Sequence, residues 1–259
     1  MHNSIIISTM KVQMQNSFAR KTFQFTLLAQ QILYTCITYF MFLHSGIRDY
    51  LSYVVLGSGM LSLWSCVVFS SAGDIDREKW MGTLTTIFAS PASFVKIVLA
   101  KILGNTILSL IPFGISFLIV HFVFREAFNI VNGLLFVIIF LFVILSFVAI
   151  AFLFSATFTL SRKASILMNC LEFPIFILCG FVFPLSILPQ GIQYISYLLS
   201  PTWASLLLKQ SVKGIEDLNA FIWALIFLLL TTILYFVIGF LLFRYMDKKV
   251  REEATLEVC

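Results

Sequence analysis

Six stretches of the chain are apolar and about 20 residues long, the length that an α-helix needs to cross a membrane. Short, more polar segments separate them, so the pattern predicts an all-α membrane protein with six transmembrane helices. The predicted spans are 23–43, 51–71, 102–123, 131–154, 164–183 and 220–243.

The segment before the first span has the periodicity of an amphipathic helix. Two sets of residues fall on opposite helical faces, namely Ile7, Met10, Met14 and Phe18 against Ser4, Ser8, Lys11 and Gln15. Such a helix lies in the membrane interface; a disordered tail is the alternative. We therefore expect an interfacial helix at 1–22, followed by a transmembrane domain at 23–259.

The segment 72–101 is the longest internal polar stretch. It begins with charged residues and then carries apolar residues at helical spacing, namely Trp80, Leu84, Ile87 and Phe88. Pro91 ends this helix because proline cannot continue one. A short helix with an apolar face needs a surface to cover it, either the bilayer or a partner protein.

Prolines interrupt the apolar chain after the fifth span, at Pro184, Pro189 and Pro201. The apolar stretch at 192–199 is too short to cross a membrane. We expect a re-entrant or interfacial hairpin at 180–201 in the outer leaflet. Non-helical backbone at that depth must be buried in protein or face water, so we expect the segment to lie near an outer gate.

The basic residues are distributed unevenly about the six predicted spans. Of 17 Lys and Arg residues, 13 fall on one side, and the other four are Arg48, Arg125, Lys209 and Lys213. The richer side is predicted to be cytoplasmic, which places both termini and the tail at 244–259 there. The basic residues cluster at the ends of spans, a pattern that indicates membrane orientation and not nucleic-acid binding.

The composition supports a membrane protein without a catalytic centre of its own. Only 11% of residues are charged, against about 25% in soluble domains. The sequence has no GxxxxGK[ST] phosphate-binding loop, GxSxG motif or HExxH pair. Its five cysteines show no metal-binding spacing. We therefore expect no catalytic residue and no metal site.

Small polar residues recur on one face of several spans, as is typical of helix–helix contacts. The second span carries Ser58, Ser62 and Ser65, the third carries Asn105, Ser109, Pro112 and Ser116, and the fifth carries Ser165, Asn169 and Glu172. A carboxylate about 12 Å deep should face the bundle interior or a wet cavity. Two interpretations of Glu172 stay open: a cavity-lining or gating residue, or a protonated or hydrogen-bonded packing residue, for which Asn169 is a candidate partner.

Two motifs resemble those of the permease subunits of type-2 ABC exporters. The first runs from Arg77 to Leu84 (REKWMGTL) and continues with Ser90, Pro91 and Lys101. It is similar to the family's cytoplasmic signature, although Thr85 stands where a glutamate is frequent. The second comprises GFVFP at 180–184, with Leu188-Pro189 and Ser200-Pro201-Thr202, and is similar to the family's outer-leaflet stretch.

The resemblance implies that a separate ABC ATPase subunit binds ATP and Mg, so this chain would hold no cofactor and would not be an enzyme by itself. The helix at 76–90 would be the coupling helix, and the helix at 1–22 the elbow helix. A second permease, identical or paralogous, would complete the pathway. The implied coupling residues are Arg77, Glu78, Trp80, Gly82, Thr83, Leu84, Phe88 and Pro91. The implied pathway or gate residues are Asn169, Glu172, Gly180, Phe183, Pro184 and Pro189.

The expected function is export of an amphipathic or lipid-like cargo, such as a drug, peptide or glycolipid, across a bacterial plasma membrane. A secondary transporter or channel is the first alternative, but such folds often show two similar halves with broken helices. Here only one interrupted segment is evident. An intramembrane enzyme lacks a nucleophile and base, and a non-transporting sensor subunit bound to an ATPase stays open.

Overall fold

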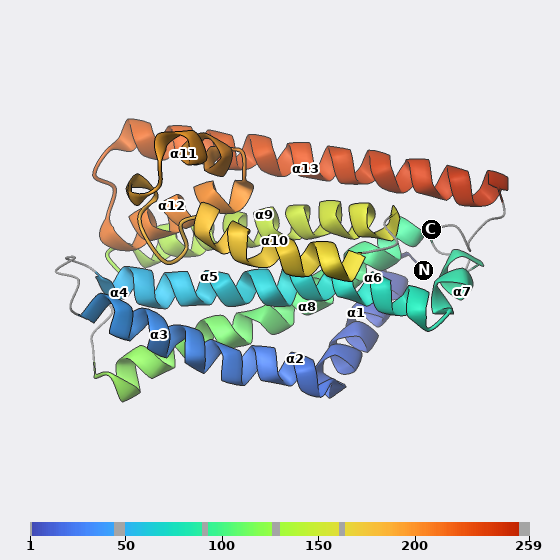
Figure 1. The fold of residues 1–259 in the computed structure, drawn as a ribbon, viewed down its shortest axis with the longest axis horizontal. Coiled ribbons are helices and arrows are strands. Elements are labelled where there is room, and N and C mark those ends of the chain that lie inside the picture. Colours follow the sequence, from blue (N-terminus) through green and yellow to red (C-terminus); the bar gives the residue numbers. More distant parts are fainter. Residues whose placement is uncertain (1, 44–49, 90–92, 126–129, 161–163, 254–259) are drawn as a thin grey trace.

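The computed structural model describes residues 2–43, 50–89, 93–125, 130–160 and 164–253 as an elongated bundle of helices (Figure 1). No strand occurs within these ranges. Five helical segments are long and apolar enough to cross a membrane: Lys21–Leu43, Tyr50–Trp80, Phe94–Val123, Gly133–Thr159 and Leu218–Met246. They match the first, second, third, fourth and sixth predicted spans, which confirms a multi-helical, membrane-type architecture.

The spanning segments are composites of shorter elements. The first joins α2 (Lys21–Phe25), η1 (Thr26–Gln30) and α3 (Gln31–Leu43), and the second joins α4 (Tyr50–Ser52), η2 (Tyr53–Gly57), α5 (Ser58–Leu63), η3 (Trp64–Phe69) and α6 (Ser70–Trp80). The third joins α8 (Phe94–Leu118) and η4 (Ile119–Val123). The fourth and last lie in α9 (Gly133–Leu160) and α13 (Leu218–Glu253). Elements η1 to η4 are π-helical turns. Such turns are rare in proteins, and those that occur are often found at functional sites.

The fifth predicted span is not confirmed among the described residues. Helix α10 (Ala164–Leu178) has 15 residues, so it is about 22 Å long against a hydrocarbon core of about 30 Å. The chain leaves the helix at Gly180, which adopts φ +62°. Three short elements follow: η5 (Leu185–Ile187), α11 (Gln190–Tyr197) and α12 (Ser200–Lys213).

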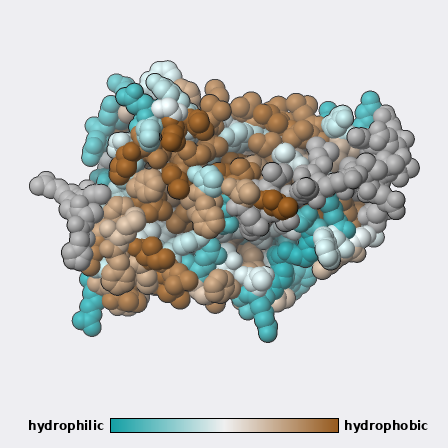
Figure 2. Space-filling model, viewed as in Figure 1, coloured by the Kyte–Doolittle hydropathy of each residue, from teal (hydrophilic) through white to brown (hydrophobic). Residues whose placement is uncertain are grey.

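The second span is the centre of the bundle, because every side chain from Val54 to Val68 is buried. Aromatic contacts join it to α9, as between Trp64 and Phe147, and join α9 to α13, as between Phe152 and Phe243. The outer spans expose apolar side chains, for example Phe40 and Leu230. Figure 2 shows apolar residues across the middle of the visible face and hydrophilic ones mainly toward its ends and lower right. A bilayer would cover this apolar band.

The two ends of the bundle are different. Helix α7 (Thr83–Ala89), the start of α1 (His2–Ala19) and the end of α13 lie at one end, which we call the α7 end (Figure 1). Helices α4, α11 and α12 lie at the opposite, or α11, end. Both termini of the described helices therefore share one end, as the distribution of basic residues predicts.

Helix α1 covers most of the predicted interfacial segment, but only part of its predicted apolar face meets the protein. Its buried residues are polar, Gln13 and Ser17, and they face the bundle, whereas Ile7 and Phe18 are exposed. A Cβ on Gly104 of α8 would lie 3.0 Å from the Met10 carbonyl oxygen, so the two helices approach closely. The predicted apolar face is therefore divided: Met14 packs against the buried cluster around Phe23, whereas Ile7 and Phe18 are exposed.

Candidate functional site

The predicted coupling helix at 76–90 is two helices and not one. Residues 76–80 belong to α6, which continues the second span without a break, and α7 begins at Thr83. Gly82 makes the turn between them with φ +68°, a conformation that favours glycine. Trp80 is 90% exposed and Met81 68% exposed at this turn. A large apolar side chain therefore projects from the α7 end.

The turn at Gly82 separates side chains that an uninterrupted helix would place together. Leu84 is buried in the main core and Ile87 packs against it, so α7 lays its apolar side on the bundle. Trp80 points outward instead. The Thr83 hydroxyl donates to the Glu78 carbonyl oxygen at 3.4 Å across the turn. The Phe88 side chain and Pro91 lie outside the described residues.

Charged side chains fasten the end of α6 to neighbouring spans. Glu78 forms an ion pair with Lys101 of α8, and Lys79 donates to the Thr159 carbonyl oxygen near the end of α9. A cation at a helix C-terminus satisfies carbonyl groups that have no partner within the helix. Arg77 pairs with Asp74 one turn earlier, at 2.9 Å. The charged residues of the motif thus make contacts within the chain.

Asp74 is the centre of a buried polar network that joins α1, α6 and α8. Its carboxylate is 5% exposed and forms ion pairs with Arg20 at 3.0 Å and Arg77 at 2.9 Å. The Gln13 and Asn105 amides also donate to it. We call these five residues the Asp74 network.

Further hydrogen bonds close this network. Ser17 donates to the Asn105 amide oxygen at 2.8 Å, and Arg20 donates to the Ser17 hydroxyl at 2.7 Å. Burial lowers the pKa of the Arg20 guanidinium from its usual value, and the adjacent Asp74 carboxylate opposes that shift. Because α1 is held by buried polar contacts, its position is coupled to the end of the second span.

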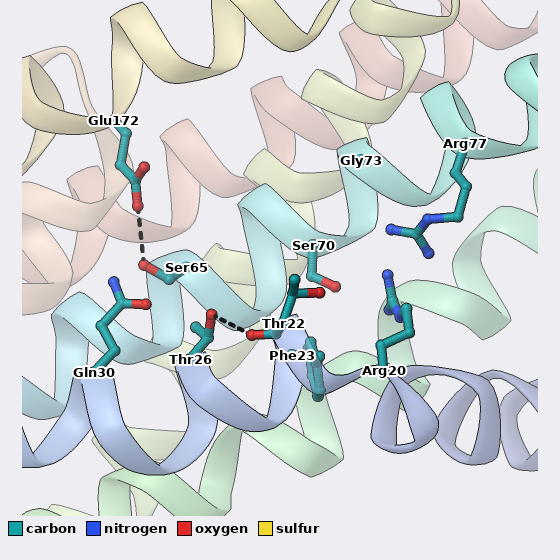
Figure 3. Close-up of a pocket in the computed structure, with 10 residues that line it drawn as sticks. All are labelled: Arg20, Thr22, Phe23, Thr26, Gln30, Ser65, Ser70, Gly73, Arg77 and Glu172. Carbon is teal, nitrogen blue, oxygen red and sulfur yellow. Dashed lines mark hydrogen bonds between the residues drawn. The ribbon is translucent and has the colours of Figure 1, made fainter.

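A cavity of about 260 Å³ lies between the first span, the second span and α10. Figure 3 shows its charged residues at opposite ends, with Glu172 at one end and Arg20 and Arg77 at the other. Thr22, Phe23, Thr26, Gln30, Ser65, Ser70 and Gly73 complete its lining. The π-helical turns η1 and η3 contribute Thr26, Gln30 and Ser65, so both spans depart from regular α-helix here.

Glu172 is half-buried and faces this cavity. It accepts a hydrogen bond from the Ser65 hydroxyl at 3.1 Å, so the second span and α10 meet at this point (Figure 3). The side chain of Asn169 lies outside the described residues, which leaves the predicted contact between the two untested. Glu172 thus lines a cavity and also takes part in a helix–helix hydrogen bond, so both interpretations of this residue stay predictions.

The other polar stripes are helix contacts, as predicted. Gln31 and Thr35 of the first span hydrogen-bond to Ser58, and Ser62 donates to Gln31. In the third span, Ser116 donates to the Val55 carbonyl oxygen at 3.3 Å. These contacts hold the first and third spans against the second.

Four of the six predicted pathway or gate residues, Gly180, Phe183, Pro184 and Pro189, lie toward the α11 end. Gly180 turns the chain after α10, and its carbonyl oxygen accepts from Lys209 at 2.7 Å and from Ser205 at 3.2 Å, both on α12. Pro184 precedes η5, Pro189 precedes α11, and the half-buried Phe183 packs against the core. These residues lie far along the bundle from α7 (Figure 1), and their role in an outer gate stays a prediction.

Two close contacts fix this segment on the second span. The Lys209 ammonium lies 4.2 Å from the centre of the Tyr53 ring, a cation–π contact. A Cβ on Gly57 would lie 2.4 Å from the Phe181 carbonyl oxygen, so only glycine allows this approach. The turn after α10 therefore packs directly against the central span.

Three features of the site are not predicted from the sequence: the role of Asp74, the buried position of Lys209, and helix α12. Asp74 lies among charged residues that read as a solvated loop, and Lys209 lies in a stretch without span-like hydropathy. Helix α12 carries signals that would have revealed it: Pro201 in its first turn, buried apolar residues at helical spacing, and Gly214 after its end.

Comparison with known proteins agrees with this arrangement. No curated protein matches the chain significantly. A family profile described as "ABC-2 family transporter protein" matches residues 3–241, which include α1, all five spanning segments to near the end of the last, and the whole 180–201 segment. The chain therefore belongs to the ABC-2 family of transporter proteins.

Proposed function

We propose that this chain is the membrane permease of an ATP-driven exporter whose ATPase is a separate polypeptide. The ATPase would bind ATP and Mg, and two permeases, identical or paralogous, would form the pathway through a bacterial plasma membrane with their termini in the cytoplasm. The single observation that carries this proposal is the family match, which spans most of the chain. An amphipathic or lipid-like cargo remains the expected class.

The contact with the ATPase is proposed to centre on Trp80 and Met81. Both are exposed at the α7 end, and an exposed tryptophan beside a short amphipathic helix is suited to a protein interface. Arg77, Glu78 and Leu84 would support this contact indirectly, because their contacts within the chain hold α6 and α7 in place.

Movement at this contact would reach the pathway through the second span. Residues 50–80 form one continuous helical segment, so no loop separates α6 from the buried part of the span, although the π-helical turn η3 lies between them. The same segment contacts Glu172 through Ser65 and the 180–201 segment through Gly57. A rigid-body shift driven by the ATPase would thus act on both the cavity and the predicted gate.

The test is purification of a tagged chain from its native cells, with measurement of the ATPase activity that purifies with it. Wild type should retain the activity, and Trp80→Ala should lose about tenfold or more, because exposed tryptophans are frequent centres of binding energy. Trp223→Ala is the matched control, since Trp223 is 59% exposed on α13 within the last span. We expect it to behave as wild type.

Two results would contradict the proposal. The first is a wild-type preparation that carries no ATPase while transport follows an ion gradient, which would indicate a secondary transporter or channel. The second is a Trp80→Ala chain that retains the full ATPase activity, which would move the contact to another surface.

A further inference from the structure

The cavity of Figure 3 has charges at both ends that the described chain does not balance. Arg20 and Arg77 share a single carboxylate, that of Asp74, so one positive charge is left over at their end. Glu172 makes no ion pair within the described ranges; Ser65 donates its hydrogen bond. The cavity is therefore positive at one end and negative at the other.

Buried polar atoms without partners line the positive end. The Ser70 hydroxyl and the Nε of Arg20 are buried, and neither has a hydrogen-bond partner in the part of the chain that the structure describes. Both residues line this cavity. A buried polar atom without a partner is costly, so these two donors are suited to a bound acceptor.

The spacing of the two ends limits the size of a ligand. Ser65 bonds Glu172 at the negative end, and Ser70, on the side of the arginines, lies five residues further along the second span, an interval on the order of 5–8 Å along the helix. A short headgroup with opposite charges fits that interval. A single ion would leave one end without its counter-charge.

The elements that line the cavity also carry aromatic side chains. Phe23 lines the cavity, and Phe25 on the first span and Phe173 on α10 are more than half exposed. The polar cavity thus lies between helices that also expose apolar side chains, an arrangement that suits a ligand with a charged headgroup and an apolar tail.

We propose that this cavity binds the headgroup of a zwitterionic amphiphile, with its amine at Glu172 and its phosphate or carboxylate at Ser70 and Arg20. The inference deepens the proposed function by naming the class of cargo, and rests on it for that role only. Binding itself requires no ATPase, so it is testable even if the coupling proposal fails.

The experiment measures competition binding to the purified chain with four dodecyl amphiphiles that differ only in headgroup: phosphoethanolamine, amine, phosphate and maltose. The phosphoethanolamine probe should bind about tenfold or more tightly than the other three, because it alone satisfies both ends. Equal affinity for all four probes would overturn the proposal.

Two variants separate the ends of the site. Glu172→Gln should weaken the phosphoethanolamine probe about tenfold and leave dodecyl phosphate unchanged. Ser70→Ala should weaken both phosphate-bearing probes about threefold and leave dodecylamine unchanged. Ser70→Ala is preferred to a change at Arg20, because Arg20 also pairs with Asp74.

The control is Glu216→Gln, which removes an exposed carboxylate between α12 and α13 and should change no affinity. A Glu172→Gln chain that loses affinity for all four probes alike would indicate general disruption and overturn the assignment. The cargo role is tested by ATP hydrolysis of the native complex. The phosphoethanolamine probe should raise the rate, and tight binding without any stimulation would contradict that role.

Discussion

Gly82 illustrates how one residue decides what the α7 end presents. Its positive φ turns the chain between α6 and α7, so Leu84 packs inward while Trp80 projects outward. A side chain at Gly82 would meet no atom within 4 Å of its Cβ in this chain. The backbone conformation, and not crowding within the chain, is what requires glycine here.

Gly82→Val should strain this turn by about 1–2 kcal/mol and lower ATP-driven transport in vesicles, with normal membrane insertion. Gly82→Asn should retain most transport, because asparagine tolerates positive φ. If both variants fail alike, space at a partner surface is the constraint, and the conformational explanation is wrong.

At the scale of elements, the second span packs so closely that one of its glycines, Gly57, fixes the position of neighbouring backbone. Gly57 meets the Phe181 carbonyl group, which belongs to the turn after α10. The turn is also held by Lys209 and Ser205. Its position is therefore set by contacts from two other elements.

Gly57→Ala should push this turn away and destabilise the chain by about 1–3 kcal/mol, as overpacking does. Gly114→Ala is the control, since that position in α8 is open and alanine favours a helix. Heat denaturation in detergent compares them, and equal stability of the two variants would show that the close approach at Gly57 is not needed.

The sequence pattern predicts the elements of this fold better than their joints. Apolar stretches identify five spans, because spanning helices need long apolar runs whatever their neighbours are. The charged run Asp74–Lys79 reads as a loop, yet it stays helical because remote residues such as Arg20 and Lys101 pair with it. Partners that come from distant segments cannot be seen in a local pattern.

The sequence likewise identifies some residues of the candidate site and misses others. Glu172 is recognisable because a carboxylate within a span is rare, whereas the arginines at the other end of its cavity look like ordinary interfacial residues. The spacing of Trp80 and Leu84 predicts a shared face only if the helix is continuous, and Gly82 interrupts it. Backbone turns of this kind depend on φ, which spacing does not reveal.

At the scale of the whole molecule, different elements form the two ends of the bundle. The start of α1, α7 and the end of α13 share one end, and α11 lies at the other (Figure 1). The distribution of basic residues predicts that the α7 end is cytoplasmic. This orientation also decides on which side an ATPase would bind.

Single cysteines in a background without the native ones test the orientation. The Met81 and Tyr194 side chains are exposed, the first next to α7 and the second on α11, at opposite ends of the bundle, so each is suitable for replacement by cysteine. A membrane-impermeant maleimide should label Tyr194→Cys on intact cells, and Met81→Cys only after the membrane is opened. The reverse pattern would invert the topology and remove the proposed ATPase contact.

The unbroken second span also sets how far a disturbance travels. Gly57 lies 23 positions before Trp80, which makes a lever of roughly 30 Å, because an α-helix rises about 1.5 Å per residue and the π-helical turn η3 rises less. A tilt of about 5° around the Trp80 end would sweep Gly57 sideways by about 3 Å. Gly57 and the Phe181 carbonyl group are packed too closely to accommodate such a displacement, so the turn after α10 would move with the second span.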